Sequence, residues 1–162
     1  MVETIVTSLV EFLQNTIPPQ LVAFAISLCP ILELRGGMIA ARLLGLPFVQ
    51  AFIICYVANM IPIPFILLFI IKIFAWMRKF PKFAKIVDKM EERSEKKKGT
   101  IEKYKEWGLL LFVAIPLPGT GGWTGSLIAA LLDLRIKKCL PIVALGVFIA
   151  GLIMSFITYG IF

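Results

Sequence analysis

A stretch rich in proline and glycine, Ile115-Pro-Leu-Pro-Gly-Thr-Gly-Gly-Trp-Thr-Gly125, lies inside an apolar run without a charged residue between Glu106 and Asp133. The run is long enough to cross a bilayer as a helix, which takes about 20 apolar residues. Its two prolines, however, each cost about 3 kcal/mol in a helix interior. Because broken backbone at membrane depth must be buried in protein or line a wet cavity, the sequence predicts a re-entrant hairpin or broken helix over Trp107–Leu132.

Composition also indicates a membrane protein. The chain has 162 residues, of which 59% are apolar, and a mean hydropathy of +0.92. This length suits one domain, here a single transmembrane domain over residues 1–162. The net charge is +7, and 12 of the 17 basic residues lie between Lys72 and Glu106, which favours a membrane surface over a nucleic acid as partner. With no histidine and three widely spaced cysteines, we expect no metal and no cofactor.

The first half of the chain begins with a helix and a second broken segment. Residues 1–16 carry apolar side chains at helical spacing and predict an amphipathic helix at the membrane interface. Repeat 1, residues 17–71, opens with two short apolar arms over Gln20–Leu46. We expect Pro30, Gly36 and Gly37 to break the centre of this segment, as prolines and glycines do elsewhere.

The remaining segments are two spanning helices and a polar linker. Pro47–Ile71 is expected to span the membrane, with a kink at Pro62 and Pro64. Residues 72–106 carry apolar side chains at spacings of three and four, with lysines and arginines between them, and predict a basic amphipathic helix on the membrane surface. Repeat 2, residues 107–162, holds the hairpin and then a second spanning helix over Cys139–Phe162.

The two repeats share a pattern of proline, paired glycines, paired alanines and paired leucines. The Gly-Gly pairs begin 85 positions apart, at Gly36 and Gly121, and the Leu-Leu pairs 88 apart, at Leu43 and Leu131. Matching broken segments are a pointer to a transporter binding site, although any two apolar hairpins share some features. We therefore predict an all-α integral membrane fold of two inverted repeats, each a re-entrant helical hairpin followed by a transmembrane helix, plus amphipathic interfacial helices.

Basic residues set the expected orientation. Each repeat crosses the membrane once, so the linker and the cluster Arg135, Lys137 and Lys138 fall on the same face. That face holds fifteen basic residues and is expected to be cytoplasmic in the cell membrane. Both termini then lie on the outer face, and the two hairpin tips can meet near the midplane.

The tips carry the candidate site. Gly-rich turns beside helix ends expose N–H groups that can hold an anion, and Arg35 could grip a phosphate or carboxylate with its planar fork. A buried Glu33 would have a raised pKa and could carry a proton. The alternative is an ion pair that only holds the hairpins in place. The candidate substrate- or proton-binding residues are Glu33, Arg35, Gly36, Gly37, Pro116, Pro118, Gly119, Thr120, Gly121, Gly122, Trp123, Thr124 and Gly125, with Asp133 and Arg135 as a secondary pair.

An enzyme is not expected. Gly119-Thr-Gly121 has neither a preceding strand nor a following Lys-Ser/Thr, as a nucleotide-binding loop would. No arrangement of nucleophile and base is evident either.

Two motifs, Pro30-Ile-Leu-Glu-Leu-Arg-Gly-Gly37 and Pro116-Leu-Pro-Gly-Thr-Gly-Gly-Trp-Thr-Gly125, resemble the signatures of the small multidrug export protein family. The resemblance runs over nearly the whole chain and implies an inner-membrane transporter. More distantly, the chain resembles the DedA superfamily. That resemblance implies lipid-phosphate translocation and proton coupling, with Glu33 matching the acidic residue of the first hairpin. The second-hairpin arginines of that superfamily are not matched here.

Three hypotheses for function follow. The first is a flippase or scramblase that moves an anionic lipid or lipid-phosphate through a site between the hairpins. The second is a proton-coupled exporter of small amphipathic compounds, and the third a membrane scaffold without transport. Expected partners are membrane lipids with anionic head groups, the transported substrate and protons; a homodimer is left open, and no nucleic acid is expected.

Overall fold

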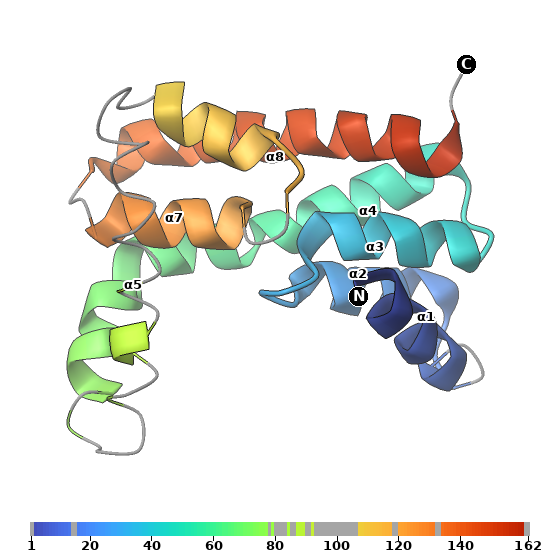
Figure 1. Ribbon diagram of the computed structural model, residues 1–162, viewed down its shortest axis with the longest axis horizontal. Helices are drawn as coiled ribbons and strands as arrows, with labels where there is room; N and C mark the ends of the chain where they lie inside the picture. The colour runs from blue at the N-terminus through green and yellow to red at the C-terminus, as the bar shows by residue number, and fades with distance from the viewer. Residues whose placement is uncertain are drawn as a thin grey trace.

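The chain is built from helices (Figure 1). The computed structural model describes residues 2–13, 16–77, 79, 84, 87–89, 92, 107–117, 120–131 and 134–160. Within these ranges no strand occurs. The helices are α1 (Val2–Leu13), α2 (Pro19–Leu28), α3 (Glu33–Leu43), α4 (Phe48–Met60), α5 (Pro62–Met77), α7 (Gly122–Leu131) and α8 (Ile136–Tyr159), and residues 107–114 are also helical.

Helices α2 and α3 form a pair joined by a short turn at residues 29–32. Pro19 suits the first turn of α2, where its missing N–H costs nothing, and α2 ends two residues before Pro30. The prediction that Gly36 and Gly37 break this segment is wrong, because both lie within α3. They serve packing instead: a methyl group on Gly37 would collide with Ser27 of α2.

Helix α1 covers the α2–α3 pair. Its Val6 and Val10 are buried in a cluster with Val22 and Ile26 of α2 and Ala40 of α3. The predicted amphipathic helix therefore exists, with its boundaries at Val2 and Leu13, and its apolar face is used by the protein itself.

Two apolar helical stretches, Phe48–Ile70 and Ile136–Tyr159, are long enough to cross a membrane. This confirms the prediction of two such helices. The first stretch is interrupted between α4 and α5 at Ile61, directly before Pro62, because a proline cannot donate to the carbonyl one turn earlier. The second, α8, takes in Lys137 and Lys138 and so begins earlier than the predicted Cys139.

Most of the predicted basic linker, residues 72–106, lies outside the described residues. Where it is described, α5 continues past Lys72 to Met77, so the helix does not end with the apolar run. Val87 is buried against Ile66 and Leu127, which ties this part of the linker to α5 and α7.

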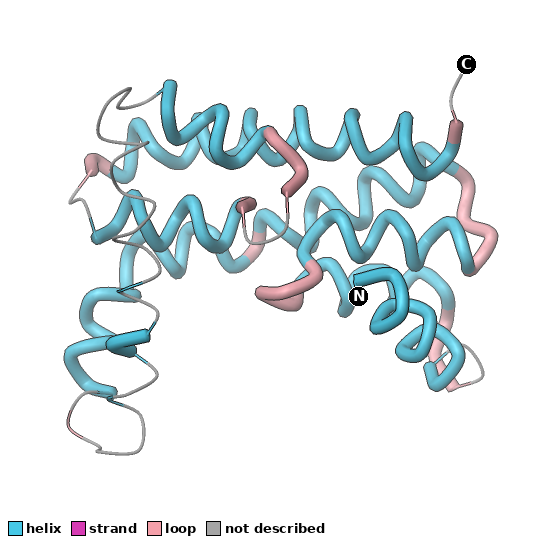
Figure 2. The backbone as a smooth tube through the Cα atoms, viewed as in Figure 1, coloured by secondary structure: helices cyan, strands magenta, loops and turns pink. Residues whose placement is uncertain are grey.

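The largest buried cluster joins both halves of the chain. It includes Leu34 and Met38 of α3, Val113 of the 107–114 helix, Ile128 of α7 and Val147 of α8. In Figures 1 and 2, α3 and α7 begin near the middle of the molecule and run away from each other, alongside the long α8. The first turns of α3 and α7 thus meet at the centre of the fold.

Candidate functional site

Glu33 is the first residue of α3 and lies at the meeting point of the two halves. Its side chain is buried, with 6% of its surface exposed. Its backbone has a φ of 52°, which lies in the left-handed region. This conformation costs a non-glycine residue roughly 1–3 kcal/mol, and residues that adopt it cluster at functional sites. This conformation ends the turn after α2 and starts α3 in a new direction.

The Glu33 carboxylate holds the beginning of α7. Its Oε2 accepts a hydrogen bond from the Gly122 N–H at 3.2 Å, so the carboxylate lies at the positive end of the α7 dipole as well as in the first turn of α3. Burial raises the pKa of Glu33, while the charge of Arg35 and the backbone N–H groups of Trp123 and Gly122 lower it. Burial is the largest of these effects, so the carboxyl holds a proton more readily than an exposed glutamate.

Gly121 leaves room for that carboxylate. Its φ of 155° is one that side chains rarely adopt, and a methyl group there would collide with the carboxyl of Glu33. The predicted break in the second segment is therefore confirmed at Gly121, with α7 starting at the next residue. The anion-binding turn predicted here binds an anion of the protein itself.

Arg35, two residues further along α3, holds the other side of the break. Its guanidinium donates to the carbonyl of Leu117, to the carbonyl of Ile115 at 3.3 Å and to Thr120 Oγ1 at 3.1 Å. The Thr120 hydroxyl lies in turn 2.8 Å from the Ile115 carbonyl and 2.9 Å from that of Leu117. Arg35 thus takes up carbonyl groups that the end of the 107–114 helix leaves without helical partners.

Glu33 and Arg35 together match the polarity of the broken helix. The negative side chain meets the N-terminal end of α7, and the positive one meets the C-terminal end of the 107–114 helix, as the helix dipole favours. This arrangement satisfies backbone groups exposed by the break and joins two motifs that lie more than 80 residues apart in sequence. The guanidinium has three protein acceptors, which favours the structural alternative for Arg35 over a free head-group site.

A small cavity lies beside Glu33. Its volume of about 10 Å³ is close to that of one water-sized sphere, and among its lining residues are Glu33, Arg35, Asn59, Val113 and Val147. Asn59 of α4 is 2% exposed, and its Oδ1 has no hydrogen-bond partner among the residues that the structure describes. Asn59 is not among the residues predicted for the site. The sequence feature that could have identified Asn59 is its position as an amide inside the uncharged run between Arg42 and Lys72, where polar groups are costly.

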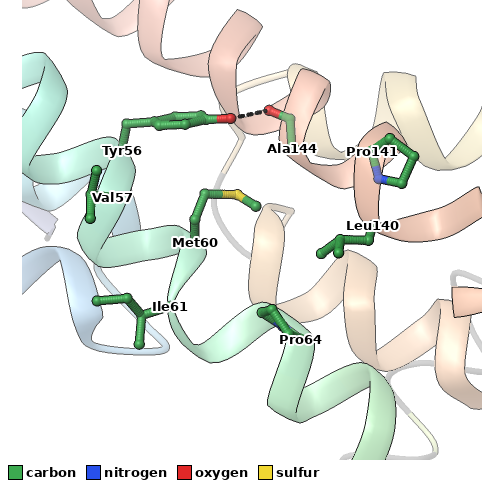
Figure 3. Close-up of a pocket in the computed structure, with 8 residues that line it drawn as sticks. All are labelled: Tyr56, Val57, Met60, Ile61, Pro64, Leu140, Pro141 and Ala144. Atoms are coloured by element: carbon green, nitrogen blue, oxygen red, sulfur yellow. Dashed lines mark hydrogen bonds between the residues drawn. The ribbon is translucent and has the colours of Figure 1, made fainter. Parts of the chain in front are cut away.

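A larger, apolar cavity, open toward the protein surface, lies where α4, α5 and α8 meet (Figure 3). Its volume is about 550 Å³, and it is lined by Tyr56, Val57, Met60, Ile61, Pro64, Leu140, Pro141 and Ala144. The only hydrogen bond drawn across it runs from the Tyr56 hydroxyl to the Ala144 carbonyl, at 3.2 Å. Asn59 and Met60 are neighbours in α4, so the two cavities share one helical turn. The sequence analysis predicted the kink at Pro62 and Pro64 but not this cavity.

Residues 33–153 match the family model described as "Putative small multi-drug export protein". The chain belongs to the small multi-drug export protein family. With the two apolar helices, this makes it a membrane protein. No curated protein and no solved structure matches the chain, and the more distant DedA-like relation stays a prediction.

In this small multi-drug export family member, the other predicted site residues are spread over the second segment and its surroundings. Trp123 packs on the cluster of Ile66 and Leu127 and so faces α5. Gly125 lies in α7 against Val113, and Gly36 lies in α3 against Val6 and Ile26. Pro116 and Thr124 are half-buried, Arg135 is exposed at the start of α8, and Pro118, Gly119 and Asp133 lie outside the described residues.

Proposed function

We propose that this chain is a proton-coupled exporter of small amphipathic compounds. The observation that carries the proposal is Glu33, a buried carboxylate held where the first turns of α3 and α7 meet. Ionisable groups inside membrane proteins commonly mark ion or proton pathways. Membership of a family described by multi-drug export supports the same function, and export requires a source of energy that a proton carrier can supply.

Protonation of Glu33 would change the contact on which the junction depends. The charged carboxylate accepts the Gly122 N–H, and charged acceptors make hydrogen bonds about twice as strong as neutral ones. A proton on Glu33 therefore weakens the hold of α3 on the start of α7. We infer that the two halves shift relative to each other when this proton is bound and released.

The apolar cavity supports amphipathic compounds as substrates. Its volume of about 550 Å³ falls within the range of small-molecule sites. Its lining of Tyr56, Met60, Pro64 and Leu140 suits the apolar body of such a compound (Figure 3). Met60 of this cavity is the chain neighbour of Asn59, which lines the small cavity with Glu33, so an occupant would lie near the proton-binding group.

The arrangement of the helices supports two inverted repeats. In this interpretation, α2 with α3 and residues 107–114 with α7 are re-entrant hairpins, followed by the spans Phe48–Ile70 and Ile136–Tyr159. Helices α3 and α7 run in opposite directions from their meeting point (Figure 1). Half-helix N-termini that meet at a site are a common feature of secondary transporters. We further propose that residues 72–106 face the cytoplasm and both termini the outer side.

Movement of an anionic lipid is less well supported by the site. A head group would need free donors, whereas the Arg35 guanidinium is bonded to Ile115, Leu117 and Thr120, and Glu33 occupies the N–H groups at the start of α7. Lipid movement and a scaffold role are therefore treated as alternative outcomes of the test.

The test uses the purified protein in liposomes. We expect an imposed pH gradient to drive efflux of a fluorescent lipophilic cation, and we expect Glu33→Gln to abolish this dependence because the amide cannot exchange a proton. Met60→Trp should also reduce efflux, since the larger side chain fills the apolar cavity. Glu11→Gln, which changes an exposed carboxylate of α1, is the matched control and should retain wild-type efflux.

Three results would contradict export. Unchanged pH-driven efflux in Glu33→Gln would remove the proton role. Movement of a labelled anionic lipid that depends on Arg35, without movement of the cation, would favour the lipid hypothesis. Movement of neither probe would favour the scaffold.

A further inference from the structure

The small cavity beside Glu33 contains a second polar group whose role the contacts above leave open. Within the described part of the chain, Asn59 Oδ1 is an acceptor with no donor, in a side chain that is 2% exposed. Such an atom costs free energy when it is buried without a partner. The Asn59 oxygen therefore either lowers the stability of the folded protein or accepts a hydrogen bond in another state of the protein.

Asn59 Oδ1 lies beside the helix end that the Glu33 carboxylate holds. Asn59 and Glu33 line the same cavity, and a methyl group on Gly122 would lie 3.7 Å from Asn59 Oδ1. Gly122 is also the residue whose N–H Glu33 accepts. Asn59 Oδ1 thus faces the α7 terminus to which the carboxylate is bound.

We propose that Glu33 and Asn59 form a two-residue proton site, in which the O–H of protonated Glu33 donates to Asn59 Oδ1 across the small cavity. One proton adds to a carboxylate oxygen, and the neutral acid then gains an acceptor that the charged form does not use. The cavity of about 10 Å³ has room for one bridging water. This inference deepens the proposed function and rests on it only for the statement that this proton drives export.

The surroundings favour a proton over a metal cation. Arg35 is the one charged residue besides Glu33 among the residues that line the cavity. Helix α8 and residues 107–114 contribute Val147, Ala150 and Val113, and α7 contributes only glycine, none of which titrates. Hard cations such as Ca²⁺ gather about six or more oxygen ligands, whereas this cavity offers one carboxyl and one amide beside a guanidinium. A proton between the two residues needs only one oxygen on each, a carboxyl oxygen of Glu33 and Oδ1 of Asn59.

The test compares two substitutions of nearly equal shape. Asn59→Val removes the acceptor, whereas Asn59→Thr keeps a hydroxyl oxygen, one bond nearer the backbone than Oδ1, that can accept from a bridging water in the cavity. In the purified full-length protein, infrared spectroscopy follows the C=O band of the protonated carboxyl with pH, and its loss in Glu33→Gln assigns the band to Glu33. We expect Asn59→Val to shift the titration midpoint about one pH unit below that of Asn59→Thr, because one hydrogen bond to the neutral acid is worth roughly that much. The band should also move to higher frequency.

The control is Gln50→Leu, which removes an exposed amide from the same helix and should leave the midpoint unchanged. Equal midpoints and band positions in the valine and threonine variants would overturn the proton site. So would a midpoint that falls when choline chloride is replaced by sodium chloride at equal ionic strength, since sodium would then compete for the carboxylate. If the midpoint shifts as expected but liposomes show no pH-driven efflux, the proton site stands and the export function falls.

Discussion

At the scale of single residues, two side chains of α3 bind the two ends of the broken segment separately. Glu33 holds an N-terminal helix end through Gly122, and Arg35 holds a C-terminal one through Ile115 and Leu117. The sequence singled out both residues because charges are rare in apolar runs. It could not show that their partners are backbone groups more than 80 positions away, since such pairing is set by the tertiary fold.

Replacement of Arg35 by lysine should destabilise the protein. A lysine ammonium is a point charge and cannot reach the acceptors on Ile115, Leu117 and Thr120 with the geometry of the planar guanidinium. We expect a loss of roughly 1–3 kcal/mol, which is about the worth of hydrogen bonds made by a charged group. Thermal unfolding in detergent measures this loss. Arg135→Lys, at an exposed position, serves as the control, and equal melting temperatures of the two variants would contradict the role given to Arg35.

Replacement of Gly121 by alanine should be more harmful than the same change at Gly45. Both glycines have positive φ, 155° and 73°, but a methyl group on Gly121 would collide with the Glu33 carboxyl, whereas one on Gly45 would have no atom within 4 Å. Gly45→Ala thus measures the backbone strain of the left-handed region alone, at roughly 1–2 kcal/mol. Adding Glu33→Ala to Gly121→Ala should recover part of the lost melting temperature. The absence of such recovery would show that the contact with Glu33 is not the cause.

At the scale of helices, some prolines and glycines predicted the helix breaks correctly and others did not. The breaks before Pro62 and at Gly121 follow from local chemistry and could be predicted. Gly36 and Gly37 have the same intrinsic preference but lie inside α3, because their lack of a side chain lets α1 and α2 approach. Local propensity cannot separate a glycine that breaks a helix from one that permits close packing; only the neighbours decide.

The break between α4 and α5 should depend on its prolines. Changing both Pro62 and Pro64 to alanine restores a backbone donor at each position and should let one straight helix form. Spin labels at the exposed positions Val49 and Phe69 would then lie farther apart. Because Pro64 lines the apolar cavity, efflux should fall while the titration of Glu33 persists. Pro47→Ala, outside both helices, is the control, and an unchanged label distance in the double variant would contradict this view.

At the scale of the whole molecule, the order of apolar runs and broken segments predicted an all-helical membrane protein with two long apolar helices, and both features are present. The contents of the centre were harder to foresee. Asn59 reaches the Glu33 cavity only because α4 packs beside α3 and α8, and the apolar cavity exists only because α4, α5 and α8 meet there. Such sites are made by packing between distant segments, about which a single sequence carries little information.

The orientation of the molecule in the membrane yields the last prediction. Basic residues are retained on the cytoplasmic side, and 12 of the 17 lie in residues 72–106. Cys29 is replaced by serine because it is the exposed one of the three cysteines, whereas Cys55 and Cys139 are buried. In this background, a cysteine introduced at Ser94 should resist an impermeant thiol reagent added to intact cells. A cysteine at Phe162 should react, since an odd number of crossings separates it from residue 94. Reaction at position 94 and protection at position 162 would reverse the orientation, and equal reaction at both would place an even number of crossings between them, which is incompatible with two inverted repeats.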